Sequence, residues 1–253
     1  MLQHPLLLDE LLPFHNEVLD FKKLSVFNLG HMFYIQGRVL SYPWSDVYSK
    51  KVVVAMCQEQ QPADIVTVDY SGEMTLFRCG HDYWMKIPDV LNSHEDICIF
   101  KGRPCVVDKT GRTMMIGSDF NVHLVAEPLI GGDVKFLVES ECELLLVDSY
   151  DSDGDDDVRI DVLRLDEKEK KWVKLANLRD RVLFLGEGCS FSASASDLGF
   201  ENGNLIIYVN GKVSGCKMCV FQLDQGRVSL VSDYPDYLKL FWPPPEWINR
   251  LHL

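Results

Sequence analysis

From Val52 onward the chain alternates short apolar or β-branched segments with polar breaks that contain Gly, Asp, Asn or Ser. Short segments of this kind, bounded by turn-forming residues, are typical of β-strands. After residue 40 no stretch has the apolar spacing of an amphipathic helix of about 10–15 residues. The pattern therefore predicts an all-β fold.

The strand segments recur in four units of similar order. Each unit holds about four strands and the units repeat every roughly 40 to 50 residues, the period of a β-propeller. The innermost strands of the four units are expected at Val52–Met56, Asp96–Phe100, Val134–Glu139 and Val182–Leu185. The closing strands are expected near Trp84, Leu124, Trp172 and Val228. We predict a β-propeller of four-stranded blades, in which the termini either add a partial blade or leave the ring incomplete.

Three local features refine this prediction. Trp84 and Trp172 end corresponding strands, so each is expected to be buried against a neighbouring blade. The apolar alternation changes phase within Val158–Leu165, which suggests a β-bulge. The Ser- and Gly-containing stretch Ser190–Gly203 is expected to be a loop.

The C-terminal segment Phe241–Ile248 reads FWPPPEWI, and its three consecutive prolines remove three backbone donors. Such a segment forms neither a helix interior nor a central strand. With a tryptophan on each side, it is predicted to lie buried against the last blade or the lead-in, as a rigid apolar seal. Residues 1–24 are expected to be an irregular lead-in, and residues 25–253 the propeller domain.

Charge and composition limit the partners and the cellular compartment that we expect for this protein. The formal net charge is −13, which argues against nucleic acid and anionic membranes as partners, because both need clustered Lys and Arg. No run of 18 apolar residues is present, so no membrane span is expected. The start lacks the basic region of a secretory signal. We therefore expect a protein of the nucleus or cytoplasm, not secreted, with reduced cysteines.

Two motifs are candidates for metal binding. The acidic stretch Asp151–Asp157 fails as an EF-hand, because Ser149 and Ile160 would occupy the first and twelfth ligand positions. The pair Cys216 and Cys219 has no second ligand pair at zinc-site spacing. An exposed acidic loop and two strand cysteines are the better interpretations, and no metal or cofactor is expected.

No catalytic motif stands out. There is no GxSxG sequence and no phosphate-binding glycine loop. Carboxylates are numerous, so an enzyme that uses a pair of them at the propeller axis, as a glycosidase does, remains an alternative. No residue is assigned a catalytic, cofactor-binding or metal-binding role, and the sequence favours a protein that is not an enzyme.

Several segments resemble one family. They are Lys101–Pro104, Leu124–Pro128, Lys135–Ser140, Asp180–Gly186 and Lys239–Trp247. Together they resemble the propeller region of plant F-box proteins with a KIB-type β-propeller, the Skp-interacting-partner proteins among them, and the resemblance runs from about His4 to Trp247.

The resemblance implies a substrate-recognition module of an SCF-type E3 ubiquitin ligase. In that family an N-terminal F-box binds the Skp-type adaptor and the propeller holds a protein target. The chain shows no F-box-like helical unit ahead of its strands, so binding to the adaptor and the cullin ligase is expected only if an F-box is supplied. A truncated gene product without an independent role is a further alternative.

Overall fold

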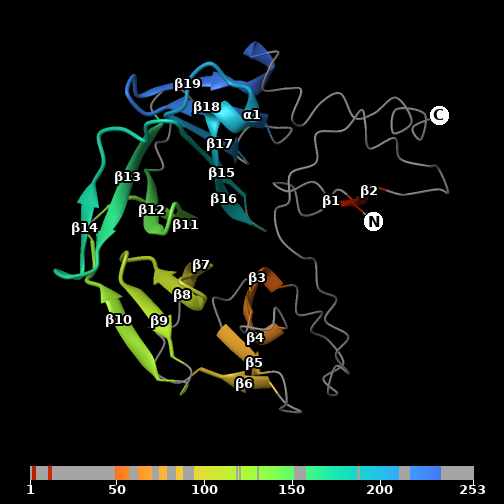
Figure 1. Ribbon diagram of the computed structural model, residues 1–253, viewed down its shortest axis with the longest axis vertical. Coiled ribbons are helices and arrows are strands. Elements are labelled where there is room, and N and C mark those ends of the chain that lie inside the picture. The colour runs from red at the N-terminus through yellow and green to blue at the C-terminus, as the bar shows by residue number, and fades with distance from the viewer. Residues whose placement is uncertain are drawn as a thin grey trace.

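The computed structural model describes residues 2–3, 11–12, 49–56, 62–69, 74–78, 84–87, 94–117, 119, 121–129, 131–150, 158–186, 189–210 and 217–234. Most of these residues lie in strands, and four sheets stand side by side in an arc (Figure 1). We call these sheets blades 1 to 4 in chain order. A separate two-stranded sheet pairs β1 (Leu2–Gln3) with β2 (Leu11–Leu12).

The first three blades are antiparallel sheets in which each strand pairs with the next along the chain. Blade 1 comprises β3 (Ser49–Met56), β4 (Pro62–Asp69), β5 (Met74–Arg78) and β6 (Trp84–Lys86). Blade 2 comprises β7 (His94–Phe100), β8 (Arg103–Asp108), β9 (Thr113–Ile116) and β10 (Val122–Ala126). Blade 3 comprises β11 (Val134–Ser140), β12 (Glu143–Tyr150), β13 (Arg159–Asp166) and β14 (Lys171–Lys174).

Blade 4 has five strands in the order β16-β15-β17-β18-β19. They are β15 (Arg181–Leu185), β16 (Ser190–Ser194), β17 (Leu205–Asn210), β18 (Lys217–Gln222) and β19 (Arg227–Leu230). The short helix α1 (Ala195–Leu198) joins β16 to β17, and the 3-10 helix η1 (Val231–Asp233) follows β19.

Two predictions about blade 4 are wrong. The innermost strand is β16, which lies beside β11, and not the predicted Val182–Leu185. That predicted strand is β15, which pairs antiparallel with β16 and parallel with β17. The stretch Ser190–Gly203, predicted as a loop, contains β16 and α1. In blade 4 the chain thus forms β15 first and then reverses direction to form the innermost strand, β16.

Blades 2 and 3 each bury both faces of their sheet, because each is packed between two neighbouring blades. In β12, Leu144 and Leu146 pack with side chains of blade 2, whereas Leu145 and Val147 pack with side chains of blade 4. All four are at most 1% exposed, and burial of apolar surface at about 25 cal/mol per Å2 holds the blades together.

The same two-sided burial corrects the predicted bulge. β13 pairs with β12 from Arg159 to Arg164 without a break in register. Val162 and Leu163 point to opposite faces, yet both are buried. A strand that is apolar on both faces loses the alternation, and this loss looks like a phase change in the sequence.

The arc is open within the described residues, since no described sheet connects β16 back to β3 (Figure 1). The all-β propeller of four repeated blades is confirmed, and its ring is incomplete in this part of the chain. The same residues include no helix with the length and apolarity needed to cross a bilayer.

Trp172 is 9% exposed and packs with blade 2 side chains such as Phe100, as predicted. The predictions for the Trp84 side chain, for Asp151–Asp157 and for Phe241–Ile248 lie outside the described residues. The five cysteines that are described are free thiols, among them Cys219 of the CxxC pair.

Candidate functional site

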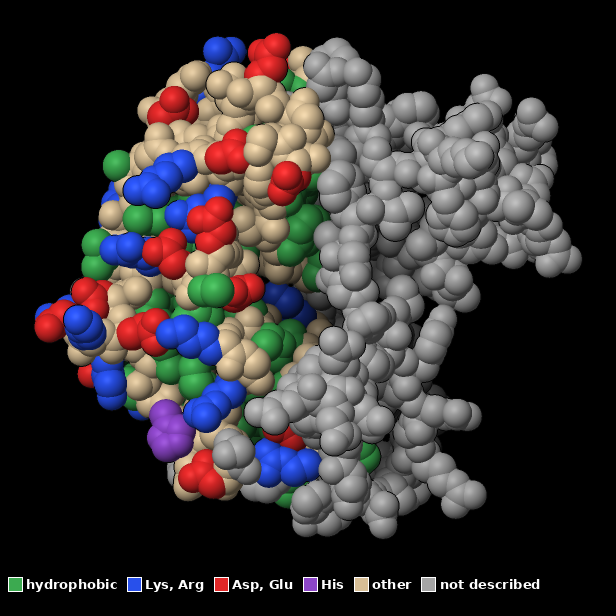
Figure 2. Space-filling model, in the orientation of Figure 1, with side chains coloured by type: hydrophobic (Ala, Val, Ile, Leu, Met, Phe, Trp, Pro, Cys, Tyr) green, Lys and Arg blue, Asp and Glu red, His purple; other side chains and the backbone are tan. Residues whose placement is uncertain are grey.

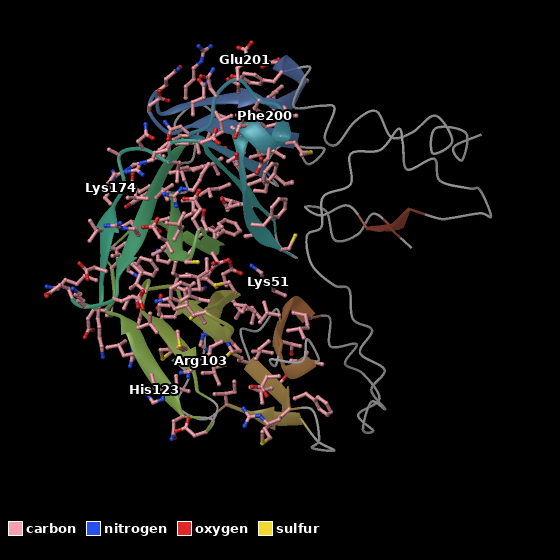
Figure 3. The ribbon with its side chains drawn as sticks, viewed as in Figure 1. Lys51, Arg103, His123, Lys174, Phe200 and Glu201 are labelled. Carbon is pink, nitrogen blue, oxygen red and sulfur yellow. The ribbon has the colours of Figure 1, made fainter. Side chains whose placement is uncertain are left out.

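A buried carboxylate holds the inner strands in place. Asp96 on β7 accepts hydrogen bonds from Lys51 Nζ on β3 at 2.7 Å and from the backbone N–H of Leu137 on β11 at 2.8 Å. Lys51 and Asp96 are 6% and 5% exposed, and Lys51 lies on the inner side of the arc (Figure 3). One side chain thereby joins blades 1, 2 and 3, which fixes the surfaces that the blades present.

The strand ends define two faces of the propeller. Face A carries the turns Lys101–Gly102, Glu141–Cys142 and Glu167–Lys170, and face B carries the turn Lys109–Arg112 and the loop Gly131–Asp133. On face A, Lys101 and Glu167 form an ion pair of 2.6 Å between blades 2 and 3. Both side chains are about half exposed, so this pair contributes little to stability.

Face B is built from internal hydrogen bonds. The carboxylate of Asp108 accepts from the Thr110 hydroxyl at 2.6 Å and from the backbone N–H groups of Thr110 and Arg112 at 2.8 and 3.2 Å. Lys135 and Asp148 form a 2.7 Å ion pair and are 1% and 0% exposed. These polar side chains therefore have hydrogen-bond or ion-pair partners within the fold, as buried polar groups generally do.

On face A, β11 and β16 leave a cavity of about 430 Å3 between blades 3 and 4. The two strands are joined there by a hydrogen bond of 2.8 Å between the hydroxyls of Ser140 and Ser192. The lining includes Glu139, Ser140, Glu141, Arg181, Ser192 and Asp197. We call this the seam cavity.

Among the described residues that line the seam cavity, Arg181 is the one cation, and it is already engaged by carboxylates. Its guanidinium donates to Glu143 at 3.1 Å and lies 3.9 Å from the Glu141 carboxylate. Burial would raise the pKa of Glu143, but the hydrogen bonds from Arg164 and Arg181 outweigh it and hold that pKa below its ordinary value. The Arg181 charge is therefore compensated, and the cavity keeps an acidic character.

A larger cavity of about 580 Å3 opens on face A beside the α1–β17 connection. Gly199 ends α1 in the left-handed conformation, and the next residue, Phe200, is buried in the core of blade 4. Glu201 follows it and is exposed at the end of the blade (Figure 3). The lining includes Arg179, Glu201, Asn202, Gln222, Asp224 and Tyr234. We call this the terminal cavity.

The ridge between the two cavities is fixed by hydrogen bonds. The carboxylate of Asp180 accepts from the hydroxyls of Ser194 and Ser196 at 2.6 and 2.8 Å, which lowers the pKa of Asp180. The backbone N–H of Leu178 donates to the side-chain oxygen of Asn204 at 2.8 Å. Hydrogen bonds thus hold the segment before β15 and the segment before β17, which border the two cavities.

On the side of the described blades that Figure 2 shows, Lys and Arg side chains are interspersed with Asp and Glu. Some of these charges pair with each other in the structure, as Lys174 does with Asp161 at 2.7 Å. In the part of the chain that the structure describes, no three His, Cys, Asp or Glu side chains gather as metal ligands. Face A thus offers recessed polar surface suited to recognition.

The sequence alone did not identify these residues. Arg181 and Glu141 come together only through the packing of blade 4 on blade 3, which no local pattern encodes. β16 did carry a signal, because Ser190, Ser192 and Ser194 alternate with Phe191 and Ala193. Polar and apolar residues in alternation are typical of a half-buried strand.

The described blades thus form a β-propeller with recessed polar surface on one face. The chain belongs to the KIB1-4 beta-propeller family, whose sequence profile matches residues 7–222. The family predicted from the sequence is thus confirmed.

Its relatives are plant F-box proteins of Arabidopsis thaliana. F-box protein SKIP23 is 36% identical over 273 residues, which cover 92% of this chain and 65% of that protein. F-box protein At2g17036 is 33% identical, with 80% of this chain and 56% of that protein covered. Putative F-box protein At5g60060 is 36% identical, with 77% and 56% covered. The chain therefore spans less than two thirds of the length of each of these relatives.

Proposed function

We propose that this chain is the target-holding propeller of an SCF-type E3 ubiquitin ligase receptor, working in the nucleus or cytoplasm. The observation that carries the proposal is membership of a propeller family whose relatives are F-box proteins. Face A is the surface that we assign to the protein target, since its two cavities lie beside each other at blade 4.

Adaptor binding is a separate property in this proposal. The described residues form strands with one four-residue helix and one 3-10 turn, whereas the resemblance places adaptor binding in a helical F-box. In this proposal the described blades hold a target without themselves binding a Skp-type adaptor. Joined to an F-box, they would bring the target to the ligase. In this proposal residues 25–253 form the propeller, and the chain acts by binding, without catalysis.

Adaptor binding is tested with two purified proteins, the chain alone and the chain preceded by the F-box of a relative. Each is mixed with a purified Skp-type adaptor and passed over a size-exclusion column. We expect the fusion to co-elute with the adaptor and the chain alone to elute separately. Stable co-elution of the chain alone would overturn the separation of the two roles.

Target holding is tested in plant cells that express either protein. Targets should decline when the fusion is expressed and should accumulate, bound to the propeller, when the chain alone is expressed. Proteins that decline must also co-purify with the propeller. If no protein meets both criteria, the receptor function is wrong.

A further inference from the structure

The two cavities of face A share one ridge. The seam cavity reaches Asp197 and Leu198 of α1, and the terminal cavity begins at the next residue, Gly199. The other side of the ridge is similar, because Arg181 lines the seam cavity and Arg179 lines the terminal cavity. A ligand that lies across the ridge would therefore reach both cavities.

Among the described lining residues of the two cavities, six carboxylates stand against two arginines. The carboxylates are Glu139, Glu141 and Asp197 in the seam cavity and Glu201, Asp224 and Asp233 in the terminal cavity. One of the two cations, Arg181, is hydrogen-bonded to Glu143, which lies outside the lining. The charge that these cavities present to a ligand is negative, like that of the chain as a whole.

The terminal cavity adds neutral acceptors and an aromatic ring. Five amide side chains line it among the described residues; the oxygens of Asn177 and Asn204 already accept backbone N–H groups of the fold, and an amide oxygen can accept further hydrogen bonds. They are Asn177, Asn202, Asn204, Gln222 and Gln225. Tyr234 lines the same cavity, and tyrosine rings attract ammonium and guanidinium groups. The lining thus favours a ligand rich in donors and positive charge.

We propose that the seam cavity and the terminal cavity together bind a lysine- or arginine-rich segment of the partner protein. This inference rests on the proposed function, because it specifies the chemistry of the target that face A holds. Two basic side chains enter the two cavities, while the backbone that joins them crosses the α1 ridge. Charge complementarity of this kind supplies specificity and association rate.

The test uses fluorescein-labelled nonapeptides of alternating Gly and Lys, alternating Gly and Arg, and alternating Gly and Glu. Fluorescence anisotropy measures their binding to the purified chain at low salt. We expect both basic peptides to bind and the acidic peptide not to bind. Higher salt should weaken binding, because exposed charges are screened.

An acidic protein attracts basic peptides without any site, so the decisive comparison uses matched variants. The site variant carries Glu141→Gln and Glu201→Gln, and the control carries Glu127→Gln and Glu169→Gln. All four side chains are exposed, and both variants change the net charge equally. We expect the site variant to lose about fivefold to tenfold in affinity, and the control to change less than about twofold.

Equal losses in the two variants would overturn the proposal, since binding would then follow the net charge alone. Equal binding of the acidic peptide, or no binding of the basic ones, would overturn it as well. Circular dichroism and melting temperature show whether both variants are folded like the parent chain. The adaptor assay is independent of this result, because a basic segment could bind face A even if the F-box fusion failed to recruit an adaptor.

Discussion

The indole N–H of Trp172 on β14 donates a hydrogen bond of 3.0 Å to the backbone carbonyl of Gly111, in the face B turn of blade 2. The ring is buried against the same blade. The side chain therefore fastens the outer strand of blade 3 to its neighbour by packing and by a specific hydrogen bond.

Replacing Trp172 should separate these two contributions. Trp172→Phe keeps most of the packing but leaves a buried carbonyl unpaired, so we expect a loss of about 1–3 kcal/mol in the free energy of unfolding. Trp172→Ala also opens a cavity and should cost about 3–5 kcal/mol. Urea denaturation measures both. Val173→Ala, at an exposed position on the same strand, should stay within about 0.5 kcal/mol, and a Phe variant as stable as the parent would contradict the role of the hydrogen bond.

Breaking the Lys51–Asp96 pair should be among the most costly single changes. Asp96→Ala leaves a buried ammonium group and the N–H of Leu137 without their acceptor, and we expect a loss of about 3–5 kcal/mol. The double variant Lys51→Ala with Asp96→Ala should lose less than the sum of the two single variants, because the unpaired charge is gone. The exposed Lys101 is the control, and Lys101→Ala should cost about 0–1 kcal/mol. Additive losses in the double variant would show that the two residues act independently.

Stability should depend on pH through His94. Burial lowers its pKa, and the nearby Asp108 opposes this only in part. The neutral imidazole is favoured in the folded state, so stability is unaffected above the unfolded pKa of about 6.5. Below it the unfolded chain takes up a proton that the folded chain resists, and stability falls until the lower folded pKa is passed. Urea titrations between these values measure the slope, which His94→Leu should reduce. An unchanged slope in His94→Leu would assign the pH dependence to other groups.

The role of Phe241–Ile248 stays a prediction from the sequence. Deleting Phe241–Leu253 removes two tryptophans and a phenylalanine, and if these are buried the loss is several kcal/mol, on the order of 3 or more. Thermal unfolding of the shortened chain checks this. A melting temperature equal to that of the full chain would show that the segment is an appendage.

The repeat could be predicted because, in most blades, each strand pairs with the next strand along the chain. Strands β7 to β9 are joined by tight turns, and Lys101 and Gly102 both have the positive φ that a two-residue hairpin requires. Turn residues and apolar runs therefore identify such strands without any knowledge of the fold. The predicted segments Asp96–Phe100 and Val134–Glu139 lie within β7 and β11.

Blade 4 was misread because its pairing is not local. A parallel pair such as β15 and β17 has no hairpin signal, since the chain must cross over between the strands. The cavities could not be predicted from the sequence for a related reason. Glu141 and Asp197 lie far apart in the sequence, and only the packing of β16 on β11 brings them to one lining.

The return of the chain at β16 also affects how the molecule is assembled and opened. In blades 2 and 3 the inner strand is the first strand of its sheet along the chain. In blade 4 the strand that meets β11 comes after β15, and it is an edge strand whose five residues are all partly exposed. β15 is enclosed on both sides and fully buried. Amide hydrogens of β16 should then exchange faster than those of β15, and we expect the boundary that carries the seam cavity to open before the interior of blade 4.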